Sequence, residues 1–415
     1  MDIINIIAVL ITLSALFGYI NARFIGLPST IGVLLVALLV SFCILLAGAM
    51  GVDAVTKAED MVRSIDFNET LMQGMLSFLL FAGALHVNLD DLSKQKGVIL
   101  SMATVGVLAS TFLVGGGSWY LLNALGIEIS LVYCLLFGAL ISPTDPIAVM
   151  GILKSAGAPK SLEIKIAGES LFNDGVAVVV FMVILGIATG GHDVGVGDIA
   201  ILFIEEAVGG TLFGLALGYL GYLMLKSIDD YQLEILITLA LVVGGYALAT
   251  ELHTSGPLAM VVAGLLIGNQ GRMFAMSDKT REHIDHSWHL IDDVLNTVLF
   301  LLIGLEVLAI SLDQSSLVVG VVMIPVVLIS RFVSVAGVVG LMRRFRDFSP
   351  GVVKILTWSG LRGGISVALV LSMPKGDERD LILTMTYVVV IFSILVQGLT
   401  VGKVIQSLRP KVQQF

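Results

Sequence analysis

The chain has 415 residues, of which 57% are hydrophobic and 13% are charged, and its formal net charge is −9 at pH 7. A soluble domain carries roughly 25% charged residues, so this composition excludes an ordinary water-soluble protein, and the acidic balance argues against nucleic acid as a partner. Apolar runs recur from end to end, each long enough to cross a hydrocarbon core of about 30 Å. We therefore expect an all-α polytopic membrane protein with one transmembrane domain over residues 1–415.

Thirteen membrane-spanning segments are predicted. In chain order they cover 3–22, 28–50, 70–88, 97–125, 129–153, 162–189, 197–226, 231–251, 257–270, 287–311, 315–342, 351–374 and 380–403. The stretch "AVTKAEDMVRSIDFNET", between the second and third segments, is predicted to be an acidic outer loop.

The lysines and arginines distribute unequally between alternate loops. One set of loops and adjoining segment ends holds 17 of them, the opposite set holds 4, and the last two, Arg331 and Arg362, lie deep inside predicted segments. Because cytoplasmic loops carry the excess of basic residues, the C-terminus is predicted to be cytoplasmic and the N-terminus external.

Two predicted segments are interrupted near their centres. The fifth contains "SPTDPIAV" and the twelfth contains "SGLRGGISVA". They lie seven segments apart, an odd offset that places the two halves of the chain in opposite orientations. Interrupted helices at matching positions of inverted repeats indicate the binding site of a transporter.

The fifth and twelfth segments also carry polar groups that need partners. Pro143 and Pro146 lack a backbone N–H and disrupt the helix, so we expect the carbonyl groups around Thr144 to become cation ligands. Asp145 is predicted either to cap the following half-helix or to belong to the site. Arg362, surrounded by glycines, is predicted to neutralise the facing carbonyl ends.

The sixth predicted segment contains "IAGESLFNDGVAVVVFMVIL", with Glu169, Asn173 and Asp174 at membrane depth. Ser170 and Asp174 are four residues apart and share a helix face, and Glu169 and Asn173 share the next face. Such oxygen ligands suit a hard monovalent cation, and a carboxylate can hold a proton instead. A purely structural polar contact between helices is the alternative reading.

Charges at membrane depth are costly and persist where they are paired or functional. Arg331, in the eleventh segment, needs a counter-ion, and we expect Glu169 to provide it. That ion pair would leave Asp174 as the one carboxylate free to titrate, which implies one-for-one exchange of a cation and a proton.

Five motifs then identify a resemblance. They are "SPTDPIAV", "GESLFNDGVAVVVF", "SGPLAMVVAGLLIGN", "FLLIGLE" and "WSGLRGGISVAL". In this order they resemble the electroneutral branch of the monovalent cation–proton antiporters, the bacterial NhaP-type and animal NHE-type exchangers. The resemblance implies a homodimer in a bacterial inner membrane, which serves pH homeostasis. It also implies scaffold helices at about 1–90 and 197–311 and moving core helices at about 97–189 and 315–403.

The resemblance also assigns roles to residues. Asp174 would bind cation or proton, and Asn173 with Asp174 would mark electroneutral exchange. Ser170 and Thr144 would help to coordinate the ion, with Asp145 nearby. Glu169 and Arg331 would form a structural ion pair, and Arg362 would belong to the unwound twelfth segment. Several relatives carry an acid on the third segment, where this chain has Ala82.

Na⁺ (or Li⁺) and H⁺ are the expected substrates, with no cofactor, and K⁺ in place of Na⁺ remains open. A channel would need a continuous pore and a repeated selectivity loop, and an intramembrane enzyme would need a catalytic motif inside the spans, which the sequence does not show. His283, His286 and His289 stand three residues apart near Asp292 and Asp293. They are predicted to form either a solvated helix face or a pH-sensing patch.

Overall fold

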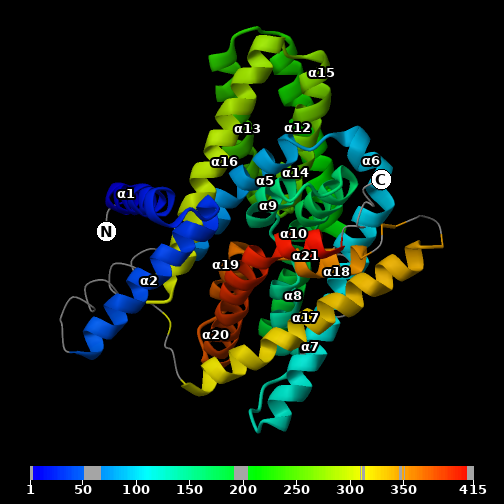
Figure 1. Ribbon diagram of the computed structural model, residues 1–415. Coiled ribbons are helices and arrows are strands. Elements are labelled where there is room, and N and C mark those ends of the chain that lie inside the picture. The colour runs from blue at the N-terminus through cyan, green and yellow to red at the C-terminus, as the bar shows by residue number, and fades with distance from the viewer. Residues whose placement is uncertain are drawn as a thin grey trace, which may run out of the picture.

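The computed structural model describes residues 3–50, 67–190, 204–308, 310, 314–344, 348–349 and 351–408. Most of the predicted acidic outer loop lies outside these residues. Within them every regular element is helical (Figure 1). Nine helices of the described chain are long and apolar enough to cross a membrane, so the predicted all-α polytopic fold is confirmed.

Each of the thirteen predicted segments contains helix, and several helices include a π-helical turn, labelled η. The first seven segments correspond to α1 (Ile3–Ile20) with η1 (Asn21–Ile25), α2 (Ser29–Ala49), α4 (Phe67–Glu69) with η2 (Thr70–Met75) and α5 (Leu76–Leu85), α6 (Leu89–Ser101) with η3 (Met102–Gly106) and α7 (Val107–Ala124), α8 (Leu131–Ile141) with α9 (Ile147–Ser155), α10 (Lys160–Thr189), and η4 (Glu205–Gly209) with α12 (Gly210–Lys226). The last six correspond to α13 (Tyr231–Glu251), α14 (Gly256–Leu266) with η5 (Ile267–Gly271) and α15 (Arg272–Phe274), α16 (Asp278–Glu306), α17 (Gln314–Met342), α18 (Val352–Trp358) with α19 (Gly364–Leu371), and α20 (Asp377–Phe392) with η6 (Ser393–Gln397) and α21 (Gly398–Leu408).

Two helices begin well before the predicted apolar segments. α16 begins at Asp278, nine residues before the predicted start at 287, because Ser277 caps it by accepting from the Thr280 N–H. α6 begins at Leu89, capped by Asn88. In both cases the first turns are polar, so hydropathy places only the membrane-embedded part, whereas a side-chain cap decides where the helix starts.

The two interrupted segments cross at their breaks. The chain leaves helical geometry between α8 and α9 and again between α18 and α19. There the Asp145 N–H donates to the Leu361 carbonyl at 2.8 Å, as an isolated antiparallel bridge. Each break therefore satisfies part of the other's free backbone, which apolar surroundings require. The crossing confirms the predicted pair of interrupted helices.

The helices pack in two groups. In one, α2 packs against α16, and α14 packs against α5 and α12. In the other, α7 packs against α8 and α17, α10 packs against α6 and α8, and α17 packs against α20. Figure 1 shows α12, α13, α15 and α16 extending together at one end, while α7, α8, α17 and α20 lie toward the other. We call the first set, with α5 and α12 to α16, the α16 group. We call the second set, with α6 to α10 and α17 to α20, the α10 group.

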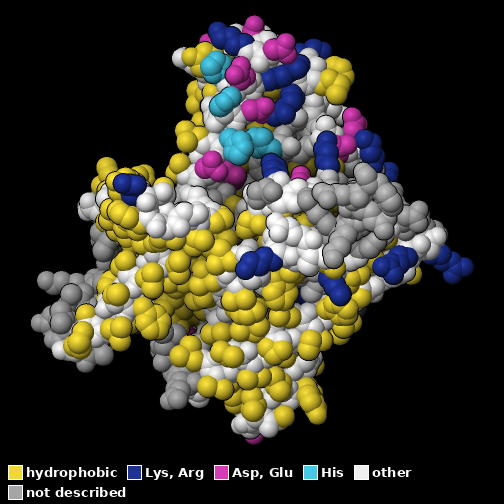
Figure 2. Space-filling view, viewed as in Figure 1, with side chains coloured by type: hydrophobic (Ala, Val, Ile, Leu, Met, Phe, Trp, Pro, Cys, Tyr) yellow, Lys and Arg dark blue, Asp and Glu magenta, His cyan; other side chains and the backbone are white. Residues whose placement is uncertain are grey.

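The surface is divided in the same direction. Lys, Arg, Asp, Glu and His side chains gather over the end formed by α12 to α16, and hydrophobic side chains cover much of the remainder of the visible face (Figure 2). Large apolar residues are exposed on the described chain, among them Phe112, Leu212 and Ile329. An apolar outer surface of this extent is what a bilayer covers.

Candidate functional site

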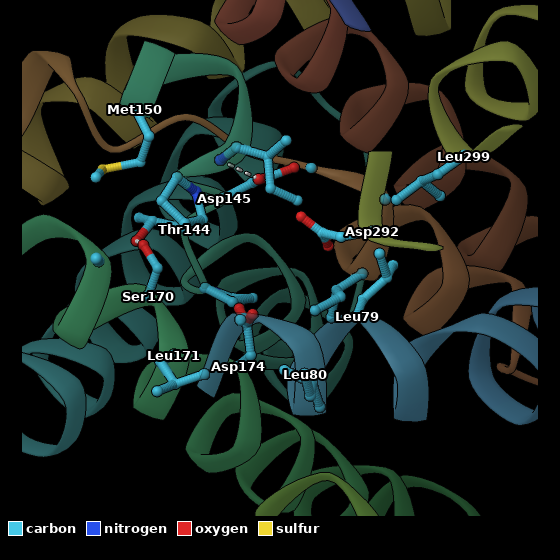
Figure 3. Close-up of a pocket in the computed structure, with 18 of the residues that line it drawn as sticks. Leu79, Leu80, Thr144, Asp145, Met150, Ser170, Leu171, Asp174, Asp292 and Leu299 are labelled. Carbon is cyan, nitrogen blue, oxygen red and sulfur yellow. Dashed lines mark hydrogen bonds between the residues drawn. The ribbon is translucent and has the colours of Figure 1, made fainter. Parts of the chain in front are cut away.

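A cavity of about 530 Å³ lies between the two helix groups. From the α10 group it is lined by α9 and α10, by the break before α9 and by α19, and from the other group by α5 and α16. Four of the predicted site residues line it together, namely Thr144, Asp145, Ser170 and Asp174 (Figure 3). The fifth, Asn173, is fully buried beside them and does not line the cavity.

Asn173 instead holds the break of the fifth segment in place. Its Nδ2 donates to Thr144 Oγ1 at 2.9 Å, and its Oδ1 accepts from the Thr144 N–H at 3.4 Å. Thr144 Oγ1 also lies 3.0 Å from Ser170 Oγ. The amide thus supplies one donor and one acceptor to a single residue of the break, which fixes Thr144 against α10.

Asp174 has no hydrogen-bond partner among the described residues, and its carboxylate lies at the cavity (Figure 3). Asp145 combines the two predicted alternatives, because its Oδ1 accepts from the Ile147 N–H at 2.9 Å while the side chain also lines the cavity. Asp145 therefore caps α9 and still contributes negative charge to the same space.

Glu169 faces the opposite way and contacts α17. Its Oε1 lies 2.6 Å from Arg331 Nη1, and both side chains are buried, 3% and 5% exposed. The expected ion pair is thus present in the structure. Arg331 Nη2 also donates to the Leu356 carbonyl at 3.3 Å, so the pair joins α10 and α17 to α18.

Arg362 satisfies the carbonyl groups that end α8. Its Nη1 donates to the carbonyls of Ser142 and Pro143, at 2.6 and 2.9 Å. The predicted neutralisation of these carbonyl ends by Arg362 is present in the structure, and cation binding by the carbonyl groups around Thr144 stays a prediction. Carbonyls at a helix C-terminus carry partial negative charge, and here a guanidinium already balances it.

Two glycines allow the close approach at the crossing. A Cβ on Gly363 would collide with the Asp145 carboxylate, and one on Gly364 would collide with Leu299 of α16. No side chain fits at either position, so the twelfth segment can pass directly beside the break of the fifth.

The three histidines of α16 have different neighbours. His283 stacks on Tyr231 of α13 with ring centres 4.2 Å apart, and His289 lies 5.2 Å from the ring of His86. His286 is exposed, and its Nδ1 lies 2.7 Å from the Glu282 carbonyl. The three rings thus contact three different groups, and the pH-sensing role stays a prediction.

Sequence reasoning missed other residues that line the cavity. His86, Lys154 and Asp292 do so. Asp292 stands seven residues before Leu299, which is also in the lining, and this helical spacing was the available signal. Ala82 is fully buried and does not line the cavity, so the absence of an acid at that position does not change the lining.

Comparison with known proteins agrees with this geometry. The profile of the family described as "Sodium/hydrogen exchanger, transmembrane" matches residues 11–406. The chain is 51% identical to the Na⁺/H⁺ antiporter NhaP of Pseudomonas aeruginosa, over 98% of this chain and 97% of the relative. It is 35% identical to the Na⁺/H⁺ antiporter NhaH of Halobacillus dabanensis, over 93% of each. The fold matches the sodium proton antiporter MjNhaP1 of Methanocaldococcus jannaschii with a TM-score of 0.75, at 19% identity, over 98% of this chain and 99% of that one.

Proposed function

The chain belongs to the transmembrane sodium/hydrogen exchanger family, and from that premise we propose that it exchanges one Na⁺ for one H⁺, with Asp174 as the shared binding group. It is a membrane transporter and not an enzyme. The observation that carries the proposal is the contrast on α10. Asp174 lies in the cavity without a hydrogen-bond or ion-pair partner among the described residues, while Glu169 is neutralised by Arg331.

A single carboxylate that binds either ion in turn leads to one-for-one exchange. Na⁺ bound to Asp174 and H⁺ bound to Asp174 give the site the same charge, so neither loaded form moves net charge. The empty, negative site should cross slowly, because moving an uncompensated charge into the membrane interior costs several kcal/mol. Exchange then follows from competition, in which each ion displaces the other.

The neighbouring groups complete the proposed cation site. Ser170 and Thr144 present hydroxyl oxygens beside Asp174, and Asp145 adds charge from the break. Oxygen donors of this kind fit a hard cation. Asn173 acts through Thr144 as a positioning residue rather than as a ligand, because both of its polar atoms bind Thr144.

Alternating access is proposed to arise from movement between the two helix groups. The cavity lies where they meet, and the ion pair and the crossing lie inside the α10 group. The scaffold would then include about 1–90 and 197–311, and the moving core about 97–189 and 315–403. We further propose a homodimer in a bacterial inner membrane with the N-terminus external, the orientation that the 17-to-4 distribution of basic residues supports.

The test uses proteoliposomes with a pH-sensitive dye inside and an imposed pH gradient. Addition of Na⁺ or Li⁺ should move protons, and valinomycin with K⁺ as a voltage clamp should leave the rate unchanged. Asp174→Asn should abolish exchange. Asp278→Asn is the control and should not abolish it, because the side chain of Asp278 is 99% exposed. Lower pH should raise the KM for Na⁺ with little change in the maximal rate, since protons compete.

Three results would overturn parts of the proposal. Exchange that survives in Asp174→Asn removes Asp174 as the shared site. Exchange that responds to the voltage clamp contradicts the one-for-one stoichiometry. Proton movement with K⁺ in place of Na⁺, measured without valinomycin, would instead identify a K⁺/H⁺ antiporter with the same machinery.

A further inference from the structure

The wall of the cavity opposite Asp174 belongs to the α16 group. α5 contributes Leu76, Leu79, Leu80 and Gly83 to it, so this part of the wall carries no charge. α16 contributes Leu299 together with His289, Asp292 and Asp293, and the side chain of Asp293 is 76% exposed. Asp292 is therefore a carboxylate that faces the cavity from the helix group that does not contain Asp174, and the proposed exchange leaves it without a role.

Asp292 is held in position from one turn further along α16. Asn296 Nδ2 donates to Asp292 Oδ1 at 3.0 Å, and Asn296 is only 1% exposed. A buried amide that binds one carboxylate oxygen restricts the side chain and leaves the other oxygen available. Figure 3 shows the carboxylate directed into the cavity, on the side away from Ser170.

No lysine or arginine of the described chain forms an ion pair with Asp292. The nearby basic residue of α15, Arg272, is paired with Asp285 instead. The other titratable groups of the lining are Asp145, Asp174, Asp293, Lys154, His86 and His289. Four carboxylates against one lysine make the cavity attractive to cations, since low-dielectric walls strengthen the field.

A separate feature indicates a polar occupant. Ser366 of α19 lines the cavity and is 1% exposed, and its hydroxyl has no hydrogen-bond partner among the described residues. Buried hydroxyl groups normally have one. This hydroxyl is thus free to bind an ion or its water as either passes through the cavity.

Resting on the proposed function, we propose that Asp292 is a second cation-binding carboxylate, which receives Na⁺ on its way to Asp174. The two carboxylates are on different helix groups. When one helix group moves against the other, Asp292 can lie close enough to pass Na⁺ to Asp174 in only one of the two orientations. The role of Asp292 is therefore one-sided, and it should set the affinity for Na⁺ on the side to which this cavity opens.

The experiment compares the KM for Na⁺ on the two sides of the membrane, in inside-out and right-side-out vesicles that contain the full chain. We expect Asp292→Asn to raise the KM about tenfold on one side only, with the maximal rate within about twofold, as for the loss of one charge facing the bound ion. Asp292→Glu should return the KM to within about threefold of wild type. Asp278→Asn is the matched control, because it makes the same charge change on α16 at a residue that does not line the cavity and whose side chain is 99% exposed.

A second measurement separates a local site from general surface charge. With high choline chloride, which screens distant charges, the KM difference between Asp292→Asn and wild type should persist. Any change in KM seen in Asp278→Asn should vanish.

Several outcomes would overturn the inference. An unchanged KM in Asp292→Asn, or an equal rise in Asp278→Asn, removes the specific role. A rise on both sides contradicts the one-sided arrangement. If Asp292→Asn does not fold, the Asp292→Glu variant is the test. A KM for Na⁺ equal to wild type together with normal stability in Asp292→Glu supports a carboxylate role. Loss of exchange activity in Asp292→Glu contradicts that role. Absence of exchange in wild type would instead reject the proposed function.

Discussion

The two faces of α10 carry the same kind of residue and use it differently. Glu169 and Asp174 are little more than one helical turn apart, yet Glu169 meets Arg331 at 2.6 Å and Asp174 meets a cavity. The difference comes from what the neighbouring helices present: α17 offers a guanidinium, whereas α5 offers leucines and a glycine. A carboxylate in a membrane helix is thus assigned to structure or to ion binding by the helix that faces it.

The largest expected effect on stability comes from breaking the ion pair between Glu169 and Arg331. Glu169→Gln leaves the Arg331 guanidinium buried without its counter-charge, and loss of one partner of a buried ion pair costs about 3–5 kcal/mol of the free energy of unfolding. Denaturant titration in micelles would measure it. Asp174→Asn, on the cavity face, should change that free energy by less than about 1 kcal/mol, because it removes no contact.

A double substitution supplies the control. Glu169→Gln combined with Arg331→Met removes both charges and should recover most of the lost stability, since a buried pair replaced by uncharged side chains is often neutral. If Asp174→Asn destabilises the protein as much as Glu169→Gln does, the proposed division between the two faces of α10 is wrong.

A smaller effect on stability is expected at the crossing of the two interrupted segments. Arg362→Gln removes the charged donor that serves the carbonyls of Ser142 and Pro143. A hydrogen bond to a charged group contributes about 1.5–3 kcal/mol, so the free energy of unfolding should fall by about that amount. Arg362→Lys keeps the charge but loses the fork of donors. The midpoint of its unfolding by denaturant should therefore lie between the midpoints of wild type and Arg362→Gln. A midpoint equal to wild type in Arg362→Gln would show that these contacts do not stabilise the break.

The smallest change in stability is expected at Asp145, which serves both as a cap and as a cavity residue. Asparagine caps a helix about as well as aspartate, so Asp145→Asn should alter the free energy of unfolding by less than about 0.5 kcal/mol. The KM for Na⁺ should nevertheless rise several-fold, because the cavity loses one charge. Thermal unfolding and exchange assays on the same preparation test both parts. A fall in stability without a change in KM would restrict Asp145 to the capping role.

Much of the fold could be predicted from the sequence. Apolar segment length, the alternation of basic loops and the prolines and glycines at two segment centres were enough to predict thirteen segments with two interruptions. The ion pair was also predictable, because Glu169 and Arg331 are costly at membrane depth and each needs a partner. These features depend on the solvent that the bilayer provides, which acts on each segment separately.

The candidate site could be predicted only in part. Asp174, Ser170 and Thr144 carried a signal because polar residues interrupt apolar helices there. Asp292 gave less signal, since it lies in a stretch of α16 that is polar on several sides. The roles of Asn173 and Arg362 at the break depend on which backbone groups lie within reach, and side-chain identity alone did not assign Asn173 to Thr144.

The sequence by itself determined which segments cross the membrane, where two of them break and which charges had to be neutralised, because these follow from local composition and the cost of burying charge. Only the tertiary structure decided which carboxylate faces a partner and which faces a cavity, and that Asn173 binds Thr144 with both of its polar atoms. It also gave the three histidines of α16 different neighbours. These outcomes depend on how helices distant in the sequence rotate and cross, and the hydropathy of a single segment does not specify that packing.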